Sequence, residues 1–163
     1  MNTTILSFDI EEWFQVENLK GSIQREDWDN RHSSVEQNTD KILALLDEHG
    51  IPATFFILGW IAERHPEMVR KISDAGYEIG CHGYNHDLTF QLEDKQLCRD
   101  IQISKKLLED ITGKDIHGYR APSFSINDRV IDHLRKMNFL YDSSLNPFKL
   151  NERYGKINSS MEK

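Results

Sequence analysis

Short apolar runs alternate along the chain with longer segments in which apolar residues recur every three or four positions. The short runs are partly β-branched and predict buried strands. They cover residues 3–8, 53–58, 77–81, 116–119 and 139–141. The longer segments predict amphipathic helices that connect the strands. They cover residues 33–50, 66–76 and 92–111, followed by a segment that begins at Asn127.

Local sequence signals mark the ends of the predicted helices. Ser33 to Glu36 has the spacing of a capping box, and Gly50 ends the helix that follows it. Pro66 suits the first position of the next helix, and Asn127 is predicted to cap the last one. The expected apolar face of the first helix consists of Val35, Ile42, Leu45 and Leu46.

The alternation of strands and helices predicts an α/β fold, in which helical crossovers connect a mostly parallel sheet. In such folds the functional residues gather at the carboxyl ends of the strands. Polar residues follow the predicted strands at several points: Asp9, Glu11, His82, Arg120 and Asp142. We therefore expect these side chains to meet at one edge of the sheet, in a single domain that covers residues 1–163.

Charge and hydropathy restrict the partners of the chain. Acidic residues outnumber basic ones by 27 to 20, and the formal charge of −7 argues against binding to nucleic acid or to an anionic membrane. No stretch reaches the roughly 20 apolar residues of a transmembrane helix, and the first residues lack the regions of a signal peptide. We expect a soluble, cytoplasmic protein whose two cysteines need not form a disulfide.

Two histidines four residues apart, His82 and His86, follow the third predicted strand. Imidazoles at this spacing can bind one cation from a helix or a tight loop, and Gly83 lets the backbone turn after the strand. The chain holds seven histidines, so the spacing alone favours a surface or capping role over a metal site. Cys81 lies on the opposite face of the strand and is expected in the core.

The first and fourth strands are also followed by charged residues. Strand periodicity places Asp9 and Glu11 on one side, where two carboxylates repel each other unless a cation or an arginine intervenes. Taken alone, the segment favours a solvated acidic loop. Glu12 is expected to point away and to be structural. Arg120 can hold a carboxylate through two hydrogen bonds, and an ordinary surface arginine fits the sequence equally well.

Together these segments resemble the polysaccharide deacetylase family, the NodB-homology group of carbohydrate esterases known as family 4. The resemblance runs from Leu6 to about Pro147. Its motifs stand in order at 7–11, 82–86, 120–123 and 142–144, with similar spacers at 53–59 and 76–80. The acid–aliphatic–acid–acid–aromatic run at 9–13 is most similar to a subgroup associated with exopolysaccharide synthesis.

The resemblance implies a distorted, incomplete (β/α) barrel with mostly parallel strands, and hydrolysis of N-acetyl groups on a polysaccharide or its precursor. It implies that Asp9 acts as the general base and that Arg120 orients it. It also implies that Glu11, His82 and His86 bind a divalent metal. The mixed nitrogen and oxygen ligands favour Zn²⁺, although cobalt, nickel or iron would also fit.

Two departures from the family pattern affect these expectations. In most of the family the two acids of the first motif are adjacent, whereas here Ile10 separates them. Glu11 is therefore the expected ligand, with Glu12 as the alternative. The late Leu-x-His motif that supplies the general acid is absent, together with the strands that close the barrel.

Two other functions stay open at the level of the sequence. One is a metal-dependent hydrolase of small cyclic or linear C–N amide substrates on the same scaffold, which would need a closed pocket in place of an open groove. The other is an inactive fragment that binds a metal or a glycan, which the missing general acid favours.

Overall fold

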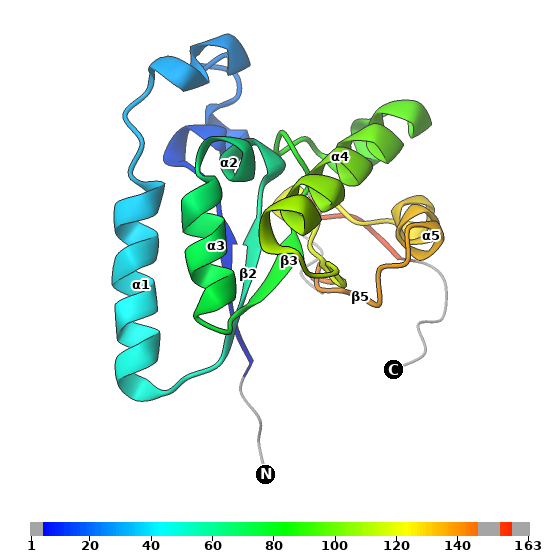
Figure 1. Cartoon of the computed structure of the whole chain (residues 1–163). Coiled ribbons are helices and arrows are strands. Elements are labelled where there is room, and N and C mark those ends of the chain that lie inside the picture. The colour runs from blue at the N-terminus through cyan, green and yellow to red at the C-terminus, as the bar shows by residue number, and fades with distance from the viewer. Residues whose placement is uncertain (1–4, 147–153, 158–163) are drawn as a thin grey trace.

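The computed structural model describes residues 5–146 and 154–157. In this part of the chain one parallel sheet is formed, with the strand order β1-β2-β3-β4-β5 (Figure 1). The strands are β1 (Leu6–Ile10), β2 (Ala53–Ile57), β3 (Glu78–Cys81), β4 (Gly118–Tyr119) and β5 (Tyr141–Asp142). Each strand pairs with the next one along the chain in parallel register. The predicted α/β class with parallel strands is confirmed.

Helices connect successive strands and cover the sheet. They are α1 (Val35–His49), α2 (Gly59–Arg64), α3 (Pro66–Asp74), α4 (Asp94–Thr112) and α5 (Asp128–Lys136). Helices α2, α3 and α4 contact one another, and Figure 1 shows α3 and α4 in front of β2 and β3. As predicted, Pro66 occupies the first turn of α3, and the Asn127 side chain accepts a hydrogen bond from Val130 N at the start of α5. Among the described residues, no helix is long and apolar enough to cross a membrane.

Strand β2 lies at the centre of the core. Phe55, Phe56 and Ile57 are all buried, as expected for a continuous apolar run that is covered on both sides. Burial of each such side chain stabilises the fold by about 1.5–3 kcal/mol. The core therefore fixes the position of β2 and, through the ladder, the ends of its neighbours β1 and β3.

The long connection between β1 and α1 is more ordered than its sequence suggested. It contains three short 3₁₀ helices, Trp13–Gln15, Glu17–Leu19 and Arg25–Asn30, where only a loop was predicted. Phe14 and Trp28 pack on Trp60 of α2, with ring centroids 5.9 and 5.5 Å from that ring. Three aromatic side chains, distant in sequence, therefore hold this connection against the body of the domain.

Several predicted boundaries differ from the structure. Strand β1 continues through Asp9 to Ile10, and residues 3 and 4 of the predicted strand lie outside the described residues. Leu45 was expected on the apolar face of α1 but is 57% exposed, because Val35, Thr39, Leu43 and Leu46 form the buried face. Helix α2 had not been predicted, since its six residues are too few to show a helical period.

The predicted capping box at Ser33 to Glu36 is wrong, and Glu12 takes its place. The side-chain oxygen Oε1 of Glu12 accepts hydrogen bonds from Ser33 Oγ, Ser34 N and Val35 N, at 2.5, 2.9 and 3.1 Å. Val35 N is the first backbone donor of α1, which lacks a partner within the helix, and Ser33 and Ser34 come directly before it. A carboxylate also interacts favourably with the positive end of the helix dipole. Glu12 is buried in this position.

We predict that Glu12→Ala destabilises the protein. Removing the carboxylate leaves buried backbone donors without an acceptor, which costs about 1–3 kcal/mol of the free energy of unfolding. Urea denaturation followed by circular dichroism would measure the loss. Glu36→Ala is the matched control, because its exposed contact with His65 contributes at most about 1 kcal/mol. An equal effect of the two substitutions would contradict the capping role.

Candidate metal centre

The carboxyl ends of β1, β3 and β4 bring the predicted site residues together. Asp9 lies in β1, and Glu11 is the first residue after the end of this strand. His82 follows β3, and Arg120 follows β4. Because all the strands of this sheet run parallel, with β2 between β1 and β3, these ends lie at one edge of the sheet.

Glu11, His82 and His86 form a compact cluster of metal-binding atoms. Each residue offers one ligand atom, and these atoms all lie within 4.8 Å of one another. Both histidines are buried, and their ring centroids are 5.6 Å apart. Two imidazoles and one carboxylate are a common ligand set of cations that keep an open position for water.

A backbone hydrogen bond orients His82. Its Nδ1 lies 2.7 Å from the carbonyl oxygen of Arg120, to which an N–H at Nδ1 donates. Nε2 then carries the lone pair and is available as a ligand. Burial lowers the pKa of His82, although the charges of Asp9 and Glu11 oppose the shift. A neutral imidazole is the form that binds a metal.

Glu11 and His86 are in close contact. His86 Nε2 and Glu11 Oε2 are 2.7 Å apart, and this buried oxygen has no other polar partner among the described residues. Burial alone would raise the pKa of Glu11, but the contact with His86 and the charges of both histidines lower it. A buried, ionised oxygen beside two imidazoles fits a site for a divalent cation.

Asp9 is held by Arg120. The guanidinium donates from Nη1 to Asp9 Oδ1 at 2.8 Å, and from Nη2 to Ser7 Oγ and Ser143 Oγ at 2.9 and 2.7 Å. Its Nε donates to the Ser143 carbonyl oxygen at 3.1 Å, and the group lies over the Phe56 ring at 4.2 Å. Every contact limits its rotation, so Arg120 fixes the orientation of the Asp9 carboxylate.

Asp9 and the metal-binding cluster share one cavity of about 150 Å³. It is lined by Asp9, Glu11, Val16, Glu17, Asn18, His82, His86, Ser123 and Phe124. The Asp9 carboxylate and the three candidate ligands therefore face the same small space. The lining from Val16 to Asn18 belongs to the 3₁₀ segment and had no recognisable signal in the sequence.

The turn from His82 to His86 has an unusual backbone. Gly83 and His86 have φ angles of 75° and 57°, in the left-handed region that side chains with a Cβ rarely adopt. Asp100 of α4 accepts hydrogen bonds from Tyr84 N and Asn85 N at 2.9 and 3.4 Å. This partly buried carboxylate holds the turn in the conformation that points His86 at Glu11. No sequence pattern had indicated its role.

Other predicted residues have structural roles. Asp142 accepts hydrogen bonds from Ser144 N and Ser144 Oγ, and Ser144 Oγ in turn accepts one from Ala121 N. This network supports the segment that carries Arg120. Cys81 is buried on the other side of β3, with its sulfur 3.3 Å from Ser104 Oγ, as expected for a core thiol.

Comparison with known proteins agrees with this fold and site. The sequence model of the polysaccharide deacetylase family matches residues 27–141. A peptidoglycan deacetylase from Helicobacter pylori is 34% identical over 134 residues, which are 78% of this chain and 46% of that protein. A peptidoglycan-N-acetylmuramic acid deacetylase from Bacillus subtilis is 28% identical over 123 residues, or 72% of this chain and 46% of that protein.

Solved structures show the same fold. A polysaccharide deacetylase from Mycobacterium smegmatis has a TM-score of 0.72 and 31% identity, over 86% of this chain and 50% of that chain. A family 4 carbohydrate esterase pseudoenzyme from Bacillus anthracis has a TM-score of 0.64 and 23% identity, over 68% of this chain and 40% of that chain. The latter likeness concerns the fold alone.

The site and the sheet define an α/β protein with a candidate metal centre at the carboxyl ends of parallel strands. The chain belongs to the polysaccharide deacetylase family. It spans about half the length, or less, of the relatives described above. The matched range begins after Asp9 and Glu11, so the roles of these two residues depend on the geometry of the site.

The protonation of Asp100 should make stability depend on pH. Burial raises the pKa of Asp100 to about 6, and the charge of Asp87 adds to the rise. The hydrogen bonds from Tyr84 N and Asn85 N and the charge of Arg25 act in the opposite direction and lower the pKa. Between the ordinary value of 3.8 and about 6, only the folded state holds this proton. The contribution of Asp100 to stability therefore falls as pH rises through this window and is constant above it.

We predict that Asp100→Asn removes this loss while keeping an acceptor for Tyr84 N–H. Relative to the unsubstituted protein, the variant should gain up to about 3 kcal/mol between pH 4 and pH 7, as measured by urea denaturation at each pH. Asp110→Asn, an exposed change on the same helix, is the control. Parallel stability curves for Asp100→Asn and the unsubstituted protein would disprove the prediction.

Proposed function

We propose that this chain binds a divalent cation through Glu11, His82 and His86 and hydrolyses N-acetyl groups on a glycan. The observation that carries the proposal is the position of the three ligand atoms within 4.8 Å of one another, in the cavity that the Asp9 carboxylate also lines. A cation site and a fixed base are the two groups that hydrolysis of an amide needs most.

The donor set supports a borderline metal ion. Two imidazole nitrogens and one carboxylate oxygen suit Zn²⁺, and Co²⁺, Ni²⁺ or Fe²⁺ would be accepted by the same ligands. Glu12 is no longer available as the alternative ligand, because its carboxylate is committed to the start of α1. We therefore assign the acidic ligand to Glu11.

Asp9 is the proposed general base. When bound, a divalent cation supplies Lewis acidity, which promotes ionisation of water and offsets negative charge on the acetyl oxygen. Asp9 takes a proton from the attacking water, and Arg120 keeps the carboxylate aimed into the cavity. The proton held by Asp9 then passes to the amine nitrogen as the C–N bond breaks, so that acetate and a free amine leave. Ser7 and Ser143 hold Arg120 in turn, so they act as positioning residues.

An N-acetylated glycan is the substrate class that the relatives support. The similar proteins from Helicobacter pylori and Bacillus subtilis are peptidoglycan deacetylases by name, which favours a sugar polymer over a small cyclic amide. The likeness of residues 9–13 to an exopolysaccharide-associated subgroup stays a prediction. The cavity is partly walled by Ser123 and Phe124, a hydroxyl and an aromatic ring that suit contact with a sugar.

We predict that His82→Ala and His86→Ala each abolish binding of one cation per chain. Removing one of three ligands leaves two, which are too few for a stable site. The metal content would be measured by elemental analysis after loading with zinc and dialysis. His49→Ala, at the exposed end of α1, should keep the full metal content. Unchanged zinc in both site variants would refute the assignment.

We predict that Asp9→Asn keeps the metal but slows acetate release about 10²–10⁴-fold, the usual contribution of a general base. Release from N-acetylated oligosaccharides would be measured for this chain and for a version extended at its carboxyl end, with Asp47→Asn on the exposed face of α1 as control. Full activity in Asp9→Asn would exclude it as the base.

The same assay tests the proposed reaction itself. No acetate from the metal-loaded protein at either length would overturn deacetylation. If the cation nevertheless binds, a metal- or glycan-binding role would then be the better description.

A further inference from the structure

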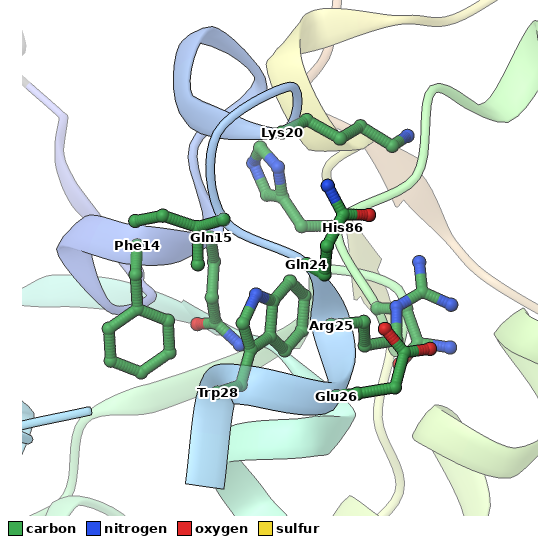
Figure 2. A pocket seen from close by; sticks show the side chains of 10 residues that line it. Phe14, Gln15, Lys20, Gln24, Arg25, Glu26, Trp28 and His86 are labelled. Carbon is green, nitrogen blue, oxygen red and sulfur yellow. The ribbon is translucent and has the colours of Figure 1, made fainter. Parts of the chain in front are cut away.

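A second pocket lies on another side of His86 (Figure 2). Its volume is about 200 Å³. It is lined by Phe14, Gln15, Lys20, Ile23, Gln24, Arg25, Glu26, Trp28, Asn85 and His86. His86 is the one residue that lines both this pocket and the cavity of the candidate metal centre.

Three buried nitrogens of this pocket have no hydrogen-bond partner among the described residues. They are Gln15 Nε2, Trp28 Nε1 and His86 Nδ1. The three residues are only 4%, 6% and 5% exposed, and Figure 2 shows their side chains around the same pocket. The Gln15 amide is oriented by Glu12 N, which donates to Gln15 Oε1 at 2.8 Å and leaves the amide N–H groups free. A buried donor without an acceptor costs about 1–3 kcal/mol.

We propose that this pocket binds a small carboxylate such as acetate. Amide and indole nitrogens offer donors only, so the missing ligand must be an acceptor. A water or hydroxyl group would bring donors of its own, for which the three nitrogens provide no acceptor. One carbonyl oxygen has two lone pairs for three donors, whereas the two oxygens of a carboxylate accept about four hydrogen bonds.

Charges of both signs lie at the edge of the pocket. Lys20 and Arg25 line it, and their side chains are close to Asp87, at 3.2 and 2.8 Å. Glu26 also lines the pocket and opposes an anion. Asp87 pairs with both cations, and Glu17 lies 3.7 Å from Lys20 Nζ, so the edge of the pocket carries no net positive charge. The buried donors provide the main attraction, because hydrogen bonds to a charged acceptor are stronger than those to a neutral one.

The donor role of His86 Nδ1 rests on the proposed function, because a ring whose Nε2 binds a cation carries its proton on Nδ1. The carboxylate and the cation would then contact opposite nitrogens of one ring. By linkage, each increases the affinity of the chain for the other. Acetate is also the product of the proposed reaction, so the pocket would respond to the product.

Nuclear magnetic resonance of the ¹⁵N-labelled chain tests the pocket directly. Sodium acetate would be added to the zinc-loaded and the metal-free chain, with sodium chloride at equal ionic strength as reference. We expect the Trp28 indole and Gln15 amide signals to shift with acetate to saturation, at lower concentration in the zinc-loaded chain. The indole of Trp13, which already donates to the His32 carbonyl oxygen, is the internal control and should not shift.

Gln15→Glu keeps the acceptor for Glu12 N–H but replaces the buried donor with a negative oxygen. It should weaken acetate binding at least about tenfold, judged from the Trp28 signal. Gln37→Glu makes the same change on the exposed face of α1 and should leave the titration unaltered. Acetate shifts no larger than those of chloride, or a normal titration in Gln15→Glu, would overturn the proposal.

Metal analysis of the same samples separates this proposal from the function proposed above. A chain that binds zinc but shows no acetate shift refutes the carboxylate pocket alone. A chain that shows the acetate shift but binds no zinc supports the pocket and refutes the metal centre.

Discussion

Arg120 joins the two halves of the site through its backbone and its side chain. Its carbonyl oxygen receives the Nδ1 hydrogen of His82 and leaves Nε2 free, while its guanidinium fixes Asp9. The proposed ligand and the proposed base therefore depend on one residue at the end of β4. Ser7 and Ser143 hold the guanidinium from either side, which ties β1 and the end of β5 to the same point.

The sequence predicted the elements that have a strong period and the residues that follow them. Parallel pairing of β1, β2 and β3 made the meeting of Glu11 with the two histidines a geometric consequence of strand order. Ser7 could also have been found, since it lies two positions before Asp9 on the same side of the strand.

The rest of the site depends on contacts between distant segments, which local patterns do not encode. Asp100 supports the turn from His82 to His86 from within α4. An acidic residue in a helix is normally interpreted from the sequence as part of the solvent-exposed face. Glu12 stabilises a helix that begins more than twenty residues later, and a capping box in the local sequence concealed it. The connection that carries Gln15 and Trp28 has no period, because aromatic packing rather than a regular helix orders it.

The side chains of the adjacent acids Glu11 and Glu12 point in different directions. Glu11 lines the cavity, and Glu12 contacts the first residues of α1. A deletion or insertion of one residue before them would exchange their directions and damage both at once. The position of this pair in the sequence is therefore restricted twice, by the proposed metal binding of Glu11 and by the hydrogen bonds of Glu12 to the start of α1. Family members that differ in the arrangement of these acids would need another means of starting the following helix.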